Sequence, residues 1–197
     1  NASQPSLFSA LLGIKMNVGD TWTDAYQAVV DKLTIDEDPK ALRSKVKQVI
    51  VEMTGSGNSQ RKAPAKNSED NLFNETEGSL KQYDTIRLAA LEVMPALHKL
   101  NTLYLNATGF LSFHEANILT ETLLQLKGMG IVAYGVHDCV IVKCSCKDEA
   151  INTYRDVIRN YVLKVQKQSG VPKVVTDVAL SVEELGLGKV KLSGSYK

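Results

Sequence analysis

Residues 131–143 read Ile-Val-Ala-Tyr-Gly-Val-His-Asp-Cys-Val-Ile-Val-Lys. Two short apolar runs are separated only by His137 and Asp138, a pattern typical of a β-hairpin. A carboxylate in such a turn is held by a rigid scaffold with its oxygens facing solvent or a ligand, which suits a hard cation such as Mg²⁺. Asp138 is therefore a candidate metal ligand. Asp is also favoured in turns, and from the hairpin alone this structural role is the better explanation.

Helical patterns flank the hairpin on both sides. Capping boxes, Ser112 with Glu115 and Ser145 with Asp148, would open the two helices next to it. A last strand is predicted over 171–180, followed by a polar tail. Helices, hairpin, helix and strand in this order predict an α+β fold with an antiparallel sheet. The predicted helices span 7–12, 23–33, 39–53, 80–105 with a break at Pro95, 112–128 and 145–168.

The composition is that of a globular protein without a strong charge bias. Of the 197 residues, Lys and Arg (23) nearly balance Asp and Glu (22), so any contact with nucleic acid must come from local basic patches. The sequence has no apolar run of about 18 residues and no signal-peptide pattern, so we expect no membrane partner. The clustered Cys139, Cys144 and Cys146 do not resemble the disulfide framework of a secreted domain, and we expect a cytoplasmic location. Cys144 and Cys146 lack the further ligands of a zinc site.

Two basic features are candidates for binding phosphate. Arg43 and Lys47 lie four residues apart beside the apolar face of the helix that Asp38 and Pro39 open, and two cations on one rigid face can clamp a triphosphate. A solvated basic face would have the same pattern. The second feature is the loop 55–79, rich in Gly, Ser and Asn, which is predicted to be mobile. It carries the basic cluster Arg61, Lys62 and Lys66.

Three motifs in this order resemble the family A DNA polymerases and the related single-subunit RNA polymerases of bacteriophages and mitochondria. Residues 1–7, Asn-Ala-Ser-Gln-Pro-Ser-Leu, resemble the first palm motif, in which an aspartate stands at the position of Asn1. Arg43 and Lys47 match the basic pair of the fingers helix. Val136, His137 and Asp138 match the third motif, whose aspartate binds metal.

The resemblance implies a polymerase-type palm with helical fingers. Residues 1–18 would belong to the palm, 19–110 to a helical fingers-like region with the mobile loop 55–79, and 111–197 to the palm with the catalytic hairpin 131–143. Because the chain starts at Asn1 without Met, we expect either a cleaved tag or a cut through a longer protein. The thumb would then precede Asn1, and the chain would be a C-terminal fragment.

The resemblance also implies a function, a two-metal nucleotidyltransferase that acts on a nucleoside triphosphate and a primer-template. Asp138 and His137 would be catalytic, with Asp138 binding Mg²⁺. Arg43 and Lys47 would hold the phosphates, Ser6 and Gln4 would lie at the nucleotide, and Arg61, Lys62 and Lys66 would contact nucleic acid.

Several positions depart from the family pattern. Cys139 stands where the DNA polymerases carry Glu after the His-Asp pair, a residue that the RNA polymerases also lack. Asn1 replaces a metal-binding carboxylate, so we expect the isolated chain to be inactive, and Gly55 stands where the family usually has a tyrosine. One alternative is therefore a non-catalytic nucleic-acid-binding or replication accessory protein with a palm-like fold. A second is an unrelated α+β interaction module in which Asp138 is only a turn residue.

Overall fold

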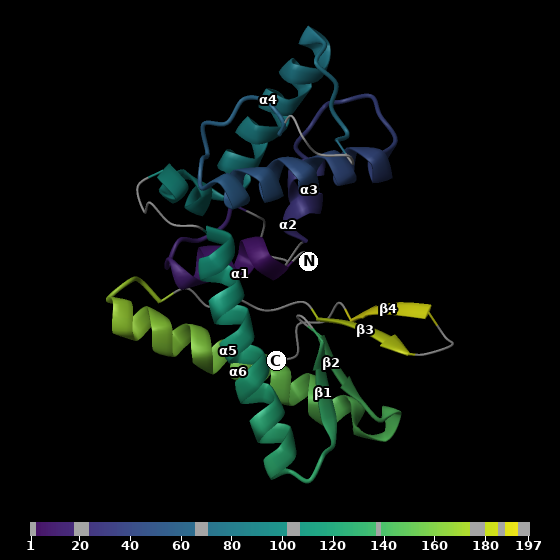
Figure 1. The fold of residues 1–197 in the computed structure, drawn as a ribbon, viewed down its shortest axis with the longest axis vertical. Helices are drawn as coiled ribbons and strands as arrows, with labels where there is room; N and C mark the ends of the chain where they lie inside the picture. Colours follow the sequence, from purple (N-terminus) through teal and green to yellow (C-terminus); the bar gives the residue numbers. More distant parts are fainter. Residues whose placement is uncertain are drawn as a thin grey trace. The chain divides into compact units, whose positions relative to one another are not determined.

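The computed structural model describes residues 3–17, 24–65, 71–101, 107–136, 139–173, 180–184 and 188–192, with the backbone alone for residue 3 and the last two ranges. Its helices and two separate two-stranded antiparallel sheets make an α+β fold (Figure 1). No helix in the described ranges is both long and apolar enough to cross a membrane.

The chain divides into two compact units, residues 1–110 and 111–197. The sequence also predicts a boundary after residue 110, whereas residues 1–18 belong to the first unit together with 19–110. The names palm and fingers for these parts remain predictions.

The first unit is helical. Its elements are α1 (Ser3–Leu11), α2 (Ala25–Val30), α3 (Pro39–Ser56), α4 (Glu77–Val93), the 3₁₀ helix η1 (Pro95–Asn101) and the first turn of α5 (Ala107–Gly128). The break predicted at Pro95 is confirmed, because α4 stops at Val93 and the chain continues as η1. The largest buried side chains, which form the core between these helices, are Phe8, Tyr26, Ile50, Met53, Tyr83, Ile86, Met94, Leu97 and Leu100.

Helix α3 begins where the sequence predicts. The carboxylate of Asp38 accepts a hydrogen bond from the amide of Ala41 at 2.9 Å, and Pro39 occupies the first helical position, where it needs no hydrogen-bond donor. The sequence predicts that α3 runs to about Met53 and is stopped by Gly55 and Gly57, and of these two glycines only Gly57 marks the observed end. Gly55 is helical, and the helix ends at Gly57, whose φ of 62° is readily adopted only by a residue without a Cβ.

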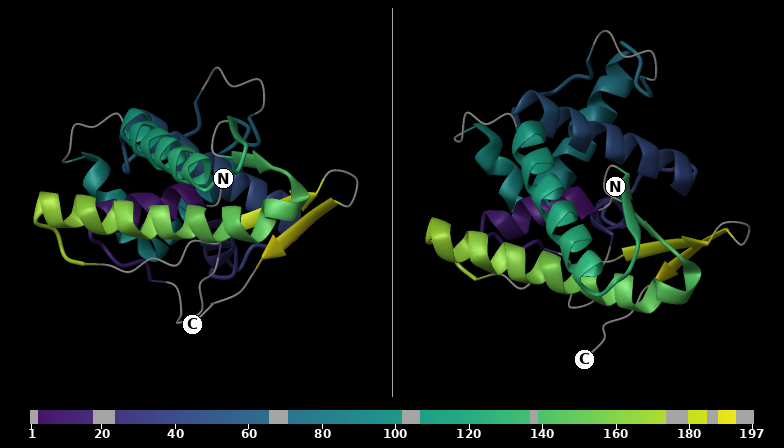
Figure 2. Two further views of the ribbon diagram at one scale, coloured as in Figure 1. Left: turned by 90° about the horizontal axis from the view of Figure 1, so that it is seen from below. Right: turned by 60° about the horizontal axis from the view of Figure 1, so that its bottom comes forward.

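The second unit contains the rest of α5, the hairpin strands β1 (Ala133–Val136) and β2 (Cys139–Val142), the 3₁₀ helix η2 (Cys144–Cys146) and α6 (Lys147–Ser169). The two strands of the predicted hairpin are confirmed as an antiparallel pair. Figures 1 and 2 show the hairpin beside α5 and α6. Gly135 allows a close approach to α5, because a Cβ there would lie 3.0 Å from methyl carbons of Leu119 and Leu123.

Both predicted capping boxes are wrong. Ser112 lies inside α5, which already begins at Ala107, so its side chain caps nothing. Ser145 lies in η2, and the cap position of α6 is Cys146, which makes no side-chain capping bond. In α6 the acidic Asp148 and Glu149 in the first turn favour the start of the helix through its dipole instead.

The end of the chain also differs from the prediction. Residues 171–173 belong to no helix or strand, and 174–179 lie outside the described residues. The strand β3 (Leu180–Glu184) pairs antiparallel with β4 (Gly188–Leu192), so part of the predicted polar tail is a strand. The signal that was missed is the alternation of residues 188–192, Gly-Lys-Val-Lys-Leu, which has the period of a strand.

Candidate functional site

Helix α3 presents three different faces. Its core face consists of Leu42, Val46, Val49, Ile50 and Met53, all buried as predicted. A second face carries Lys45, Gln48 and Glu52, which make polar contacts with α4 and with the loop between α3 and α4. Lys47 is exposed on the third face, and Arg43 lies at the border between this face and the core.

Arg43 is held against α2. Its guanidinium forms an ion pair with the carboxylate of Asp24 and lies 5.4 Å from the centre of the Tyr26 ring. Asp24 is also the cap of α2, since its Oδ1 accepts a hydrogen bond from the amide of Tyr26 at 3.0 Å. A cap before a helix is visible in a sequence. Its pairing with an arginine 19 residues away depends on tertiary packing.

Lys47 has a different environment from Arg43. Its side chain is exposed, and it has no ion pair or hydrogen bond within the described part of the chain. Arg43 and Lys47 therefore supply a fixed cation and a solvated one on neighbouring turns of α3. Whether they bind phosphate remains a prediction.

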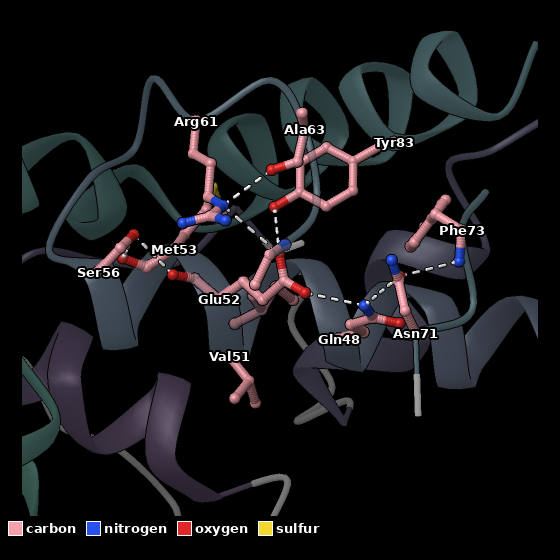
Figure 3. Close-up of polar contacts among 12 residues, drawn as sticks. Gln48, Val51, Glu52, Met53, Ser56, Arg61, Ala63, Asn71, Phe73 and Tyr83 are labelled. Carbon is pink, nitrogen blue, oxygen red and sulfur yellow. Dashed lines mark hydrogen bonds and ion pairs between the residues drawn. The ribbon is translucent and has the colours of Figure 1, made fainter. Parts of the chain in front are cut away.

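Glu52 is the centre of a polar network that connects α3 to α4 and to the loop after α3 (Figure 3). One carboxylate oxygen accepts a hydrogen bond from Gln48 at 2.8 Å. The other accepts bonds from the Tyr83 hydroxyl and the Ala65 amide, both at 3.1 Å. The same oxygen lies 3.5 Å from Nε of Arg61. Burial, followed by the charge and hydrogen bond of Glu52, raises the pKa of Tyr83, while Arg61 acts in the opposite direction.

Gln48 holds a second part of the same loop, at Asn71 and Leu72. Its side chain donates to Oδ1 of Asn71 at 2.8 Å and accepts from the amide of Leu72 at 2.9 Å. Asn71 in turn accepts from the amide of Phe73 at 3.1 Å (Figure 3). The loop 55–79 is thus attached to α3 both before and after the undescribed residues 66–70, through Ala65 and through Asn71 and Leu72. The prediction of a mobile loop did not foresee these contacts, since it considered composition alone.

The predicted basic cluster of this loop is divided by these contacts. Arg61 faces Glu52 and also donates to the carbonyl of Ala63 at 2.8 Å. Lys62 is exposed, and Lys66 lies outside the described residues. Of the described pair, Lys62 is the one whose side chain is directed to solvent, so it is the better candidate for contact with nucleic acid.

The proposed catalytic end of the hairpin lies outside the described residues. The register pairs Val136 with Cys139, and His137 and Asp138 are the two residues that join the strands. Asn1 is likewise not described. Among the residues that are described, no group of three or more His, Cys, Asp or Glu side chains could hold a metal ion.

The other predicted nucleotide-binding residues lie in α1. Ser6 is buried, and its hydroxyl has no hydrogen-bond partner among the described residues. Gln4 is half-buried. Neither position tests the predicted role at the nucleotide, which remains a prediction.

The second unit contains a polar pair, a buried His114 with a half-buried Tyr161, that the sequence did not reveal. Nδ1 of His114 on α5 lies 2.8 Å from the hydroxyl of Tyr161 on α6. Burial lowers the pKa of His114 and raises that of Tyr161. This contact joins two helices, and a spacing of 47 residues gives no local signal for it.

Comparison of the chain with models of protein families, with curated proteins and with solved structures found no match.

Proposed function

We propose that this chain is the palm-and-fingers part of a template-directed nucleic-acid polymerase, a two-metal nucleotidyltransferase. The observation that carries the proposal is the hairpin β1–β2 between the long helices α5 and α6, whose strands are joined by the residues His137 and Asp138 alone. A two-residue connection between paired strands is typical of a β-hairpin, and these two residues are the ones that resemble the third polymerase motif.

The α3 cations supply the second part of the proposal. A triphosphate that approaches α3 would meet the exposed ammonium of Lys47 and the fixed guanidinium of Arg43. The guanidinium offers a planar set of donors, whereas the ammonium offers a compact charge. Together they would bind the β and γ phosphates and stabilise the charge on the leaving pyrophosphate.

Asp138 is the proposed metal ligand. Its carboxylate offers the oxygen donors that Mg²⁺ prefers, but Asn1 stands at the position where the family pattern has a second carboxylate. When bound, Mg²⁺ would neutralise charge on the triphosphate and activate the attacking hydroxyl. With one carboxylate fewer, we expect the chain to bind a Mg²⁺-triphosphate complex without efficient turnover.

Titration calorimetry with ATP and with dATP, each with and without Mg²⁺, tests the triphosphate site. We expect Arg43→Ala and Lys47→Ala each to weaken binding about tenfold, because each removes a charge-assisted contact. Lys81→Ala on α4 is the matched control, since Lys81 is also an exposed helical lysine, and it should leave the affinity unchanged. Equal affinities for all four proteins, or no binding by any of them, would overturn the proposal.

The metal site is tested with the same assay. Asp138→Asn should remove the part of the affinity that depends on Mg²⁺ while leaving the binding of metal-free ATP unchanged. If Asp138→Asn shows the same Mg²⁺ dependence as the natural chain, Asp138 is not a metal ligand.

A non-catalytic nucleic-acid-binding or accessory protein is the second candidate, and Asn1 in place of the expected carboxylate favours it. Fluorescence anisotropy with a primed DNA, at stepped salt concentrations, distinguishes the two. Affinity that falls with salt, without Mg²⁺-dependent binding of ATP, would support the accessory protein over the polymerase. In that case Lys62→Ala should weaken binding and reduce the salt slope by about one.

A further inference from the structure

We infer that Asp24 is a positioning residue for the triphosphate site, which acts by holding the guanidinium of Arg43 in one orientation. The inference rests on the proposed function and adds a residue to it that the polymerase resemblance does not include. Asp24 itself would not touch the triphosphate.

Two contacts fix Arg43 from different sides. The carboxylate of Asp24 binds Nη2, and the ring of Tyr26, which is only 2% exposed, lies beside the guanidinium. The side chains of Arg43 and Asp24 are 35% and 20% exposed, so the pair is half-buried and open to solvent on one side. A guanidinium with a carboxylate at one edge and an aromatic ring nearby has far fewer rotamers than a solvated arginine.

The two oxygens of the Asp24 carboxylate have different partners, which leaves N–H groups of Arg43 available to bind a phosphate. Its Oδ1 accepts the amide hydrogen of Tyr26 as the cap of α2, so only Oδ2 reaches the guanidinium. A carboxylate with both oxygens on Arg43 would occupy two of its five N–H donors in the bidentate geometry that a phosphate uses. Here one nitrogen is engaged, and within the described residues the other N–H groups of Arg43 have no partner.

This arrangement reduces the conformational entropy that Arg43 loses when it binds a phosphate. A flexible arginine loses rotamer freedom when it binds phosphate, whereas a prepositioned one has already lost it. Lys47, exposed and without such a partner, keeps its freedom until the ligand arrives. Asp24 therefore fixes the direction in which the guanidinium of Arg43 donates hydrogen bonds to the proposed triphosphate, whereas Lys47 contributes a mobile charge.

The test is a double-mutant cycle with Mg²⁺-ATP as the probe. Asp24→Ser removes the carboxylate but keeps a good helix cap, which separates the loss of the ion pair from the loss of α2. We expect Asp24→Ser to weaken binding about three- to tenfold in the natural chain, and less than about twofold in the Arg43→Ala background. A merely structural role would weaken binding equally in both backgrounds.

Asp24→Asn is the isosteric variant, and it has one oxygen acceptor where Asp24 uses two, Oδ1 for the Tyr26 amide and Oδ2 for Arg43. If its oxygen caps α2, its NH2 group faces the guanidinium, so we expect Asp24→Asn to weaken binding about as much as Asp24→Ser. Tighter binding by Asp24→Ser would mean that the carboxylate competes with phosphate for Arg43, and would overturn the inference. So would an unchanged affinity of Asp24→Ser in a chain that Arg43→Ala weakens, although the proposed function would survive both results. No binding by the natural chain would overturn both.

Discussion

The two units fix their protruding segments by opposite means. In the first unit the loop after α3 is attached by polar side chains, since Glu52 accepts from the amide of Ala65 and Gln48 from the amide of Leu72. In the second unit the hairpin β1–β2 is attached by apolar contact, through the side of β1 at which Gly135 meets leucines of α5. Hydrogen bonds from polar side chains fix one position for a loop, and losing one partner leaves a buried polar group unsatisfied, which lowers the free energy of unfolding. The stability of apolar contacts depends instead on the shape and volume of the side chains.

The faces that the two segments leave open differ as well. On the hairpin, Tyr134 and Val136 of β1 share a face with Cys139 and Ile141 of β2, and all four are exposed, Tyr134 to 66%. The loop instead exposes polar residues such as Lys62. We therefore expect substitutions in the first unit to act through unsatisfied hydrogen bonds, and those in the second through packing.

The largest effect is expected at Glu52. Glu52→Ala leaves the Tyr83 hydroxyl and the Ala65 amide without their acceptor, and should reduce the free energy of unfolding by about 3 kcal/mol in urea titrations followed by circular dichroism. Glu92→Ala is the matched control, because the Glu92 side chain is 64% exposed in its ion pair with Lys32. It should cost less than about 1 kcal/mol. Equal losses would show that the Glu52 network does not hold the loop.

The second effect concerns the hairpin. Gly135→Ala would place a Cβ 3.0 Å from the ends of Leu119 and Leu123, so these side chains must shift, at a cost of about 1 to 2 kcal/mol. Shortening one of them should relieve the clash, and Leu123→Ala should cost less in the Gly135→Ala background than in the natural chain. Additive losses would contradict the close packing of β1 on α5.

A smaller effect is expected at the polar pair of the second unit. Tyr161→Phe removes the hydroxyl that contacts His114 and should cost about 1 kcal/mol at pH 7.5. A loss as large as that of Glu52→Ala would mean that the second unit depends on buried polar contacts as much as the first.

The same pair predicts a pH dependence. Burial lowers the pKa of His114 below its ordinary value of 6.5, so the unfolded chain binds more protons than the folded one. The free energy of unfolding should therefore fall as the pH is lowered through 6.5. His114→Gln should reduce this slope, and His98→Gln, at an exposed position, should not. An unchanged slope in His114→Gln would assign the dependence to other groups.

The smallest effect has the opposite sign. Gly78 lies in the first turn of α4, and an added Cβ would meet no atom within 4 Å. Gly78→Ala should stabilise the protein by about 0.5 kcal/mol, because alanine loses less backbone entropy in a helix. The melting temperatures of Gly78→Ala and Gly135→Ala compare a glycine with free space around it to one that packs against leucines. A lower melting temperature of Gly78→Ala than of the natural chain would contradict the free space at Gly78.

Local patterns predicted the elements whose causes are local. Asp38 and Pro39 mark the start of α3, and the alternating runs around residues 137 and 138 mark the two strands, because caps and strand periods depend on neighbouring residues. The starts of α5 and α6 were wrong, since α5 begins before Ser112 and α6 after Ser145, whereas the predicted ends near residues 128 and 168 agree with the structure.

The surroundings of the candidate residues depend on contacts between distant segments. Arg43 and Lys47 have the same spacing in the sequence as any basic pair on a helix, and only the position of Asp24 on α2 distinguishes them. Glu52 shows no special pattern, yet its partners Arg61, Ala65 and Tyr83 come from separate segments. Asp138, the residue on which the proposed function depends most, lies outside the described residues.

The two-residue connection of β1 and β2 also has a kinetic consequence. Strands joined so closely pair without closing a long loop, so we expect the hairpin to form in about 1 to 10 μs. The first unit includes a hydrogen bond from Asn17 to the carbonyl of Glu92, across 75 residues. Such a contact forms only after a long loop has closed, which lowers the entropy of the chain and slows folding. We expect the hairpin to be present early in refolding, and the attachment of the chain near Asn17 to α4 to follow it.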